Sequence, residues 1–179
     1  MVYLFLANGF EEIEALTPLD MLRRAGIEVT SVSINKDNTV TGAHGIKVIA
    51  DKVIDNIPIT DIDMVILPGG LPGADNLRLD SRVNAFIDEA INLNKFVCAI
   101  CAAPRILGEK GLLKGKNAVC YPGFEQYLDG ANVVDAGCVR DGNIITSKGM
   151  GKATEFSLSL IEALKDKDTA EKIRNSIFA

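Results

Sequence analysis

The apolar residues of this 179-residue chain fall into short dense runs and longer segments of helical spacing. Three runs are apolar on both alternating faces, which is typical of strands buried on both sides of a parallel sheet. They are residues 2–7, 63–67 and 96–100. Three longer segments repeat apolar residues every three or four positions and are therefore predicted helices. They are residues 10–25, 81–93 and 153–164.

Shorter patterns fill the remaining chain. A strand is predicted at residues 27–34, a small antiparallel excursion at 35–51, and one helical turn at 124–128. Later strands are predicted at residues 117–121, 133–134 and 139–146, followed by a helical tail after 164. Strands that alternate with helices, with no linker or repeat between them, predict one domain over residues 1–179. The fold class is α/β, a flavodoxin-like three-layer α/β/α sandwich with a mostly parallel sheet.

The first helix presents a choice of buried face. Its apolar stripe is predicted as Ile13, Leu16, Leu19 and Leu22. Three glutamates, at positions 11, 12 and 14, open this helix, where negative charge suits the helix dipole. Of these only Glu14 lies near the predicted inward stripe, so it is expected to need a partner or a proton.

Composition limits the classes of function. The net charge is −5 and the basic residues are scattered, which disfavours a nucleic-acid surface. With neither a basic leader nor a long apolar run, the chain is expected to be cytoplasmic, with no membrane partner. Its four cysteines are expected to be reduced thiols rather than a disulfide framework. The single histidine, His44, is the only one that a cysteine–histidine mechanism could use.

The stretch after the third apolar run carries the candidate chemistry. Cys101 follows the strand directly, and Pro104 favours a helix that begins within a residue or two of it. This strand-to-helix nucleophile elbow exposes the thiol to free backbone N–H groups, which favours a thiolate. The alternative is a buried structural cysteine. Cys98 lies three positions earlier in the strand, too far for a disulfide, and is assigned to the core.

Other residues could complete a site around Cys101. Glu14 could share a hydrogen with the thiol, although a favourable helix start explains it equally well. Gly69 and Gly70, in a Pro-Gly-Gly turn, could supply oxyanion N–H groups together with Ala102. The same turn could also be purely structural. Cys120 and Cys138 are assigned structural roles. No metal site is predicted, because the cysteine spacings do not pair.

Several linked motifs resemble the DJ/ThiJ/PfpI superfamily, in the branch of the Parkinson-disease-associated DJ protein and its bacterial relatives. The motifs are NGFEEIE at 8–14, MLRRAG at 21–26, LPGG at 67–70, AICAAP at 99–104 and TSKG at 146–149. The resemblance implies a homodimer without a cofactor. It also implies a reactive, readily oxidised Cys101, a protonated Glu14 partner, and Gly70 and Ala102 as amide donors. Tyr121 and Arg24 are candidates for the surrounding pocket.

The resemblance suggests two functions. The first is a cysteine-dependent stress protein that acts on small reactive carbonyls, as a cofactor-independent glyoxalase or deglycase with Cys101 as nucleophile and Glu14 as proton partner. The second is a redox sensor or chaperone in which an oxidant converts Cys101 to sulfenate or sulfinate. Tyr121 stands where glyoxalase members carry a histidine, and a phenol is a poor base at neutral pH. Peptidase activity is not expected, because Ala102 stands where the peptidase branch has a histidine.

Overall fold

The computed structural model describes all residues, Met1 to Ala179. Its main sheet has seven strands in the order β10-β11-β7-β6-β1-β2-β5. All neighbours pair in parallel except β10 and β11, which form an antiparallel hairpin. These strands are β1 (Val2–Leu6), β2 (Val29–Ser33), β5 (Lys52–Val53), β6 (Met64–Leu67), β7 (Phe96–Ile100), β10 (Cys138–Asp141) and β11 (Ile144–Ser147).

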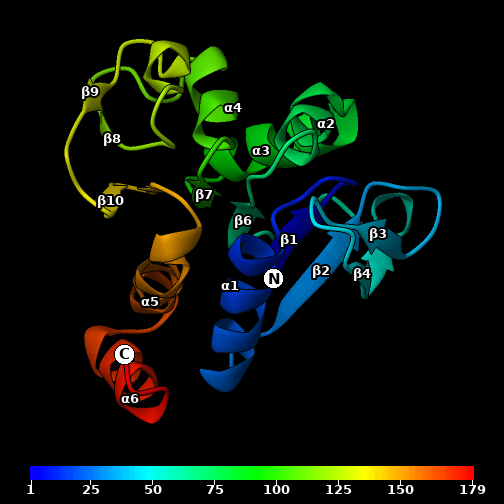
Figure 1. Cartoon of the computed structure of the whole chain (residues 1–179), viewed down its shortest axis with the longest axis horizontal. Coiled ribbons are helices and arrows are strands. Elements are labelled where there is room, and N and C mark those ends of the chain that lie inside the picture. Colours follow the sequence, from blue (N-terminus) through cyan, green and yellow to red (C-terminus); the bar gives the residue numbers. More distant parts are fainter.

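The parallel strands β2, β1, β6, β7 and β11 give the 2-1-3-4-5 order of a flavodoxin-like sheet. Helices cover both faces (Figure 1). The helices are α1 (Glu12–Arg24), α2 (Gly73–Leu79), α3 (Ser81–Asn92), α4 (Pro104–Glu109), α5 (Ala153–Leu164) and α6 (Lys167–Ser176). The predicted three-layer α/β/α sandwich is confirmed. None of these helices combines the length and apolar character needed to cross a bilayer.

Each face of the sheet has its own core. Phe5 and Val65 point toward α2, α3 and α4, where Phe86 packs edge-on against Phe5 with ring centroids 5.1 Å apart. Leu4 and Ile66 point the other way, toward α1, α5 and α6. Side chains of β1 and β6 alternate between the two cores, as the pleat of a strand requires. The unbroken apolar runs of the sequence are therefore strands buried on both faces.

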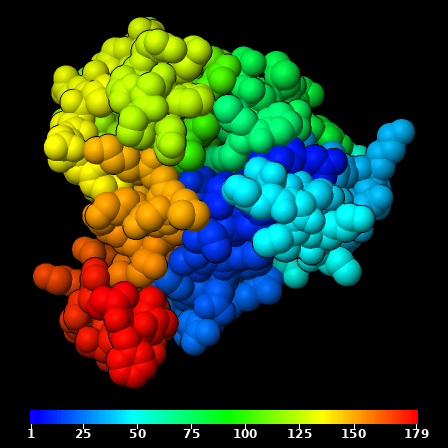
Figure 2. All heavy atoms as spheres, viewed as in Figure 1, coloured from blue at the N-terminus to red at the C-terminus, as the bar shows by residue number.

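Short elements lie outside the main sheet, including two separate two-stranded sheets. The predicted antiparallel excursion is confirmed as β3 (Thr39–Thr41) and β4 (Lys47–Ile49), which lie beside the N-terminal segment in Figure 2. The predicted helical turn is confirmed as a 3₁₀ turn, η2 (Glu125–Tyr127). Two further 3₁₀ turns are η1 (Ile54–Asn56) and η3 (Met150–Lys152). The predicted strand at 117–121 is only β8 (Asn117–Ala118), which pairs with β9 (Asn132–Val133) outside the main sheet.

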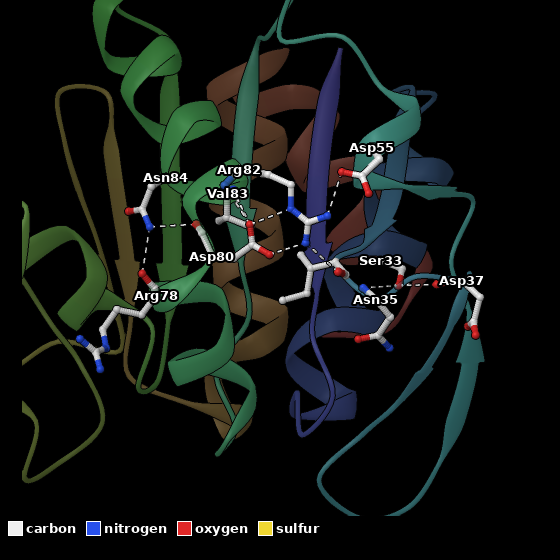
Figure 3. Close-up of polar contacts among 10 residues, drawn as sticks. Ser33, Asn35, Asp37, Asp55, Arg78, Asp80, Arg82, Val83 and Asn84 are labelled. Atoms are coloured by element: carbon white, nitrogen blue, oxygen red, sulfur yellow. Dashed lines mark hydrogen bonds and ion pairs between the residues drawn. The ribbon is translucent and has the colours of Figure 1, made fainter.

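Arg82 ties the start of α3 to the segments that follow β2 and β5. Arg82 binds Asp80 at the helix start, the backbone oxygen of Ile34 at 2.9 Å and Asp55 at 2.8 Å (Figure 3). Asp80 also accepts the N–H of Val83 and so caps α3. This network lies on the β2 and β5 side of the molecule, away from the loops that follow β7.

The first helix buries a different face from the one predicted. Ile13 is 47% exposed, whereas Glu12 and Glu14 are both buried. The inward stripe is Glu14, Ala15, Pro18, Met21 and Leu22, with Glu12 buried beside it. The prediction of Ile13 is wrong, because the helix is rotated so that carboxylates, not isoleucine, face neighbouring loops that supply N–H donors. Leu16 is only half-buried, whereas Leu19 packs against the core and Leu22 is buried, as predicted.

Candidate functional site

Four loops meet at the carboxyl edge of the parallel strands. They follow β1, β6, β7 and β11, and backbone hydrogen bonds join them. Glu11 N–H donates to the Gly69 oxygen at 2.9 Å, and Cys101 N–H donates to the Ser147 oxygen at 2.9 Å. Tyr121 N–H donates to the Cys101 oxygen at 2.8 Å, which brings in the segment after β8. The structure therefore gathers the residues that the sequence places at strand ends into one region.

Cys101 occupies a strained elbow between β7 and α4. Its φ of 66° lies in the left-handed region, which a residue with a Cβ adopts at a cost of about 1–2 kcal/mol. This turn moves the chain out of the strand, so α4 begins only at Pro104 and not within two residues of Cys101 as predicted. With six residues, α4 contributes little dipole. The thiol is half-buried and meets individual N–H groups instead.

Glu14 lies against Cys101 and is only 1% exposed. Its Oε2 accepts the N–H of Gly69 at 2.9 Å, and the carboxyl group also hydrogen-bonds the Cys101 side chain and the Met150 backbone. Burial raises the pKa of Glu14 from 4.5 to about 7, and the charge of Glu11 acts in the same direction. Near neutral pH this carboxyl group can therefore either accept or donate a proton.

The Cys101 thiol is less acidic than predicted. Burial raises its pKa to about 12, assisted by the charge of Glu14 and the hydrogen bond to it, whereas the N–H groups of Gly70 and Ala102 oppose the shift. The prediction of a thiolate from the elbow alone is wrong, because desolvation outweighs the two amides. The ionised Glu14 carboxylate beside the sulfur therefore opposes loss of the thiol proton. Above about pH 7 the pair holds one negative charge and one shared proton.

The two glycines of the Pro-Gly-Gly turn have different roles. Gly70 N–H faces the Cys101 sulfur, as does that of Ala102, so the structure brings these two predicted donors together. Gly69 N–H is bound to Glu14 and is not available to an oxyanion, which corrects the prediction for that residue. A Cβ on Gly69 would lie 2.6 Å from both the Cys101 Cβ and the Glu14 Oε2. Gly69 therefore packs against both Cys101 and Glu14 and leaves no room for a side chain.

Tyr121 lies at the rim of the site, where the segment after β8 meets solvent. Its side chain is 51% exposed and packs edge-on to Phe124, with ring centroids 6.5 Å apart. A Cβ on Gly149 would be 3.4 Å from the Tyr121 ring and 3.9 Å from Glu14 Oε1, so the ring and the carboxyl group both lie next to Gly149. The ring, Met150 and the two lysines at positions 148 and 152 line a shallow depression beside the reactive pair.

Arg24 does not share this region. It lies in the last turn of α1, ten residues or about 15 Å along the helix from Glu14. Its Nε pairs with Asp20 Oδ2 at 2.6 Å on the surface. Within this chain, the prediction of Arg24 as a pocket residue near Cys101 is wrong, because the helix carries it to the far end of the molecule.

Glu12 and His44 form an ion pair that the sequence pattern did not predict. The buried Glu12 carboxylate accepts the His44 backbone N–H at 2.8 Å and lies 2.8 Å from the ring Nδ1. His44 therefore contacts α1 through Glu12 and does not form a cysteine–histidine pair. Glu11, Glu12 and His44 bring ligand atoms within 4.8 Å of one another. Glu11 Oε2 already accepts the Glu14 N–H at 2.7 Å, so we assign no metal to this group.

The remaining cysteines are free thiols, of which Cys98 and Cys120 are buried and Cys138 is half-buried. Cys98 is fully buried in β7, where desolvation raises its pKa well above 9.0. Burial likewise raises the pKa of Cys120 and of Cys138 to about 11. Neither has an acidic partner comparable with Glu14. Cys101 is distinguished from them by its backbone conformation and its shared proton.

Comparisons with known proteins identify relatives over nearly the whole chain. The profile of the DJ-1/PfpI family matches residues 1–163. Protein DJ-1 homolog B of Arabidopsis thaliana is 38% identical over 170 residues, 94% of this chain and 39% of that protein. This chain thus spans about two fifths of that relative. Protein dj-1beta of Drosophila melanogaster is 34% identical over 96% of this chain and 93% of its own length. The solved structure described as Toxoplasma gondii DJ-1, oxidized, superposes with a TM-score of 0.95 at 36% identity, covering 99% and 97% of the two chains.

Proposed function

The chain belongs to the DJ-1/PfpI family, and from that premise we propose that it is a cysteine-dependent protein acting on small reactive carbonyl compounds. The observation that carries this proposal is the contact between the Cys101 thiol and the buried Glu14 carboxyl group, with the N–H groups of Gly70 and Ala102 facing the sulfur. A nucleophile, a proton acceptor and two oxyanion donors are the parts that carbonyl addition needs. All belong to this chain and need no cofactor.

The first chemical step follows from these contacts. As the Cys101 sulfur attacks the aldehyde carbon, its proton moves to the Glu14 carboxylate. The C=O π electrons move to oxygen, where the N–H groups of Gly70 and Ala102 stabilise the developing charge. Protonated Glu14 then gives its proton to that oxygen. An S–H bond and a C=O π bond are exchanged for S–C and O–H bonds, which yields a hemithioacetal on Cys101.

Completion of a glyoxalase reaction on methylglyoxal needs further proton transfers. A proton must pass from one substrate carbon to the next, and water must then cleave the resulting thioester to release lactate. Glu14 is the acid–base group within reach of the sulfur. Tyr121 lies next to Gly149, as Glu14 does, and a phenol is suited to donating a hydrogen bond rather than to acting as a base. We therefore propose slow turnover.

Methylglyoxal consumption tests the proposal. The wild-type protein should consume it, Cys101→Ser should abolish consumption, and Glu14→Gln should lower the rate by about 10²–10⁴-fold, as expected for loss of an acid–base group. Cys138→Ser is the matched control, because it removes another half-buried thiol without touching the pair. Equal consumption by the wild type and Cys101→Ser would refute the carbonyl reaction.

A second candidate function is sensing of oxidants. The N–H groups of Gly70 and Ala102 that would hold an oxyanion would equally hold sulfinate oxygens on Cys101. The Toxoplasma gondii relative is described as oxidized, which supports the same chemistry in this family. Mass spectrometry after mild peroxide treatment should then find added oxygen on Cys101 before Cys120. Oxidation of Cys120 with Cys101 unmodified would refute this candidate and, with it, a chaperone role switched by oxidation.

We also propose a cytoplasmic homodimer. Isoleucines at positions 13, 46 and 49 are exposed on α1 and the β3–β4 hairpin, and Ile49 is 83% exposed. Burying them against a second copy would remove apolar surface from water. The four free thiols suit a reducing compartment. Light scattering after size exclusion should give twice the 19.2 kDa chain mass, and Ile49→Lys should shift it toward the monomer.

A further inference from the structure

Arg105 occupies an unusual position for a charged residue. It is the second residue of α4, directly after the elbow, and its side chain is only 14% exposed. Its Nη1 lies 2.9 Å from Asp75 Oδ1, and its Nε donates to Glu109 Oε1 at 3.3 Å. Its guanidinium also stacks over the Tyr127 ring, 4.7 Å from the centroid. The Arg105 side chain thus contacts α2 and η2 as well as its own helix, α4.

Each of these three elements, α2, α4 and η2, directly follows a loop of the site. Asp75 lies in α2, which follows the turn that carries Gly70. Arg105 itself lies in α4, which follows Cys101 and Ala102. Tyr127 lies in η2, which follows the segment that carries Tyr121. The side chain therefore ties together the oxyanion turn, the elbow and the rim.

The contacts to these loops are close. The Tyr127 ring packs against Phe124 at 5.8 Å, and Phe124 packs against Tyr121 at 6.5 Å, so an aromatic series leads from Arg105 to the rim. A side chain on Gly108, one turn further along α4, would collide with the Tyr127 backbone oxygen. The backbones of α4 and η2 are thus in close contact next to the Arg105 guanidinium.

Asp75 depends on this arginine. Its Oδ1 is buried and accepts no well-aligned hydrogen bond, so its charge is offset by Arg105 at 2.9 Å and Arg78 at 3.6 Å. The Asp75 side chain is 36% exposed, and without Arg105 only Arg78 at 3.6 Å would hold its carboxylate, which favours movement of that side chain toward water. Loss of Arg105 should therefore move the start of α2, and with it the turn that holds Gly70.

We propose that Arg105 is a positioning residue that holds the Gly70 turn and the Tyr121 rim in register with Cys101. As an account of catalysis it rests on the proposed function, but as an account of the site's geometry it does not. The guanidinium is suited to the task, because a planar group can pair in its own plane and stack on an aromatic ring at once. A lysine ammonium is a compact point charge without a planar fork, so it could make one of these contacts but not both at once.

Alkylation of Cys101 by iodoacetamide across a range of pH tests the proposal without any carbonyl substrate. Displacement of the Gly70 N–H removes a donor to the sulfur, so Arg105→Gln should slow alkylation at pH 7.5 about 10-fold and shift the profile to higher pH. Arg105→Lys should restore part of the rate. The control is Arg82→Gln, which breaks a second arginine network, at the other end of α2 from the Gly70 turn (Figure 3).

The thermal unfolding midpoint separates positioning from folding. If Arg105→Gln and Arg82→Gln both lower the midpoint yet only the former changes the alkylation profile, the proposal holds. Unchanged alkylation in Arg105→Gln would overturn the proposal and leave Arg105 a purely structural residue.

If Arg105→Gln fails to fold, Asp75→Asn provides a second test. This variant removes only the tie to α2 and should shift the alkylation profile in the same direction. An unchanged profile in Asp75→Asn would also overturn the proposal. Absence of methylglyoxal consumption by the wild type would refute the carbonyl reaction but leave this test intact.

Discussion

The strained elbow makes a quantitative prediction about stability. Cys101 has φ of 66°, and a residue with a Cβ pays about 1–2 kcal/mol in that region, a cost that glycine avoids. Glycine in exchange adds freedom to the unfolded chain, worth about 0.4–1 kcal/mol. Both Cys101→Gly and Cys101→Ala remove the sulfur, so their difference isolates the backbone. Cys101→Gly should be the more stable of the two by about 1 kcal/mol, or about 2–4 °C in midpoint.

A second pair of variants supplies the control. Ala103 lies two residues further along the same turn with an ordinary φ of −70°. There, glycine should destabilise by at least about 0.5–1 kcal/mol, because it gains flexibility when unfolded and relieves no strain. Urea unfolding of all the variants gives the two differences. The reasoning is refuted if Cys101→Ala is as stable as Cys101→Gly, or if glycine has the same sign of effect at both positions.

Three further predictions concern the surroundings of the pair. Gly69→Ala puts a methyl group 2.6 Å from the Cys101 Cβ, so it should destabilise by about 1–3 kcal/mol and slow alkylation; unchanged rates would contradict the packing. The Glu12 carboxylate raises the pKa of His44, so this pair stabilises the fold below the ordinary histidine pKa of 6.5 and loses its effect as pH rises through the higher folded value. The unfolding midpoint of the wild type relative to that of His44→Gln should therefore fall as the pH is raised above 6.5, and parallel curves would contradict this. Tyr121→His supplies a base near neutral pH and should raise methylglyoxal turnover at least about 10-fold, whereas no gain would show that this position does not limit the reaction.

The sequence predicted the sheet well, because its central strands are buried on both faces and carry almost no polar residue. The prediction failed where the pairing of a strand depends on segments that are distant in the sequence. Residues 117–121 are apolar like a strand, but the free edge of β11 is taken by β10, so only Asn117–Ala118 pairs, and it does so with β9. The short α2 escaped prediction because its seven residues follow directly on a Gly- and Pro-rich turn.

The site was predicted in part. Cys101, Glu14, Gly70 and Ala102 do lie together, because parallel strands deliver their loops to one edge of the sheet. Gly69 was misassigned, since no pattern in the chain says which of two adjacent amides turns toward a carboxylate.

Contacts between distant segments were the hardest to foresee. Glu12 was overlooked because a buried carboxylate is stable only with the donors of a loop more than thirty residues away. Arg105 gave no signal at all, since its partners lie on two other elements.

The rate of Cys101 alkylation as a function of pH, in the wild type and in Glu14→Gln, tests the shared proton most directly. In the wild type the rate should rise with an inflection near pH 7, as Glu14 ionises and becomes able to accept the thiol proton. In Glu14→Gln that inflection should disappear, and the rate should climb only in the alkaline range, because the buried thiol must ionise unaided. The same inflection in both proteins, or none near pH 7 in the wild type, would contradict the pairing of Cys101 with Glu14.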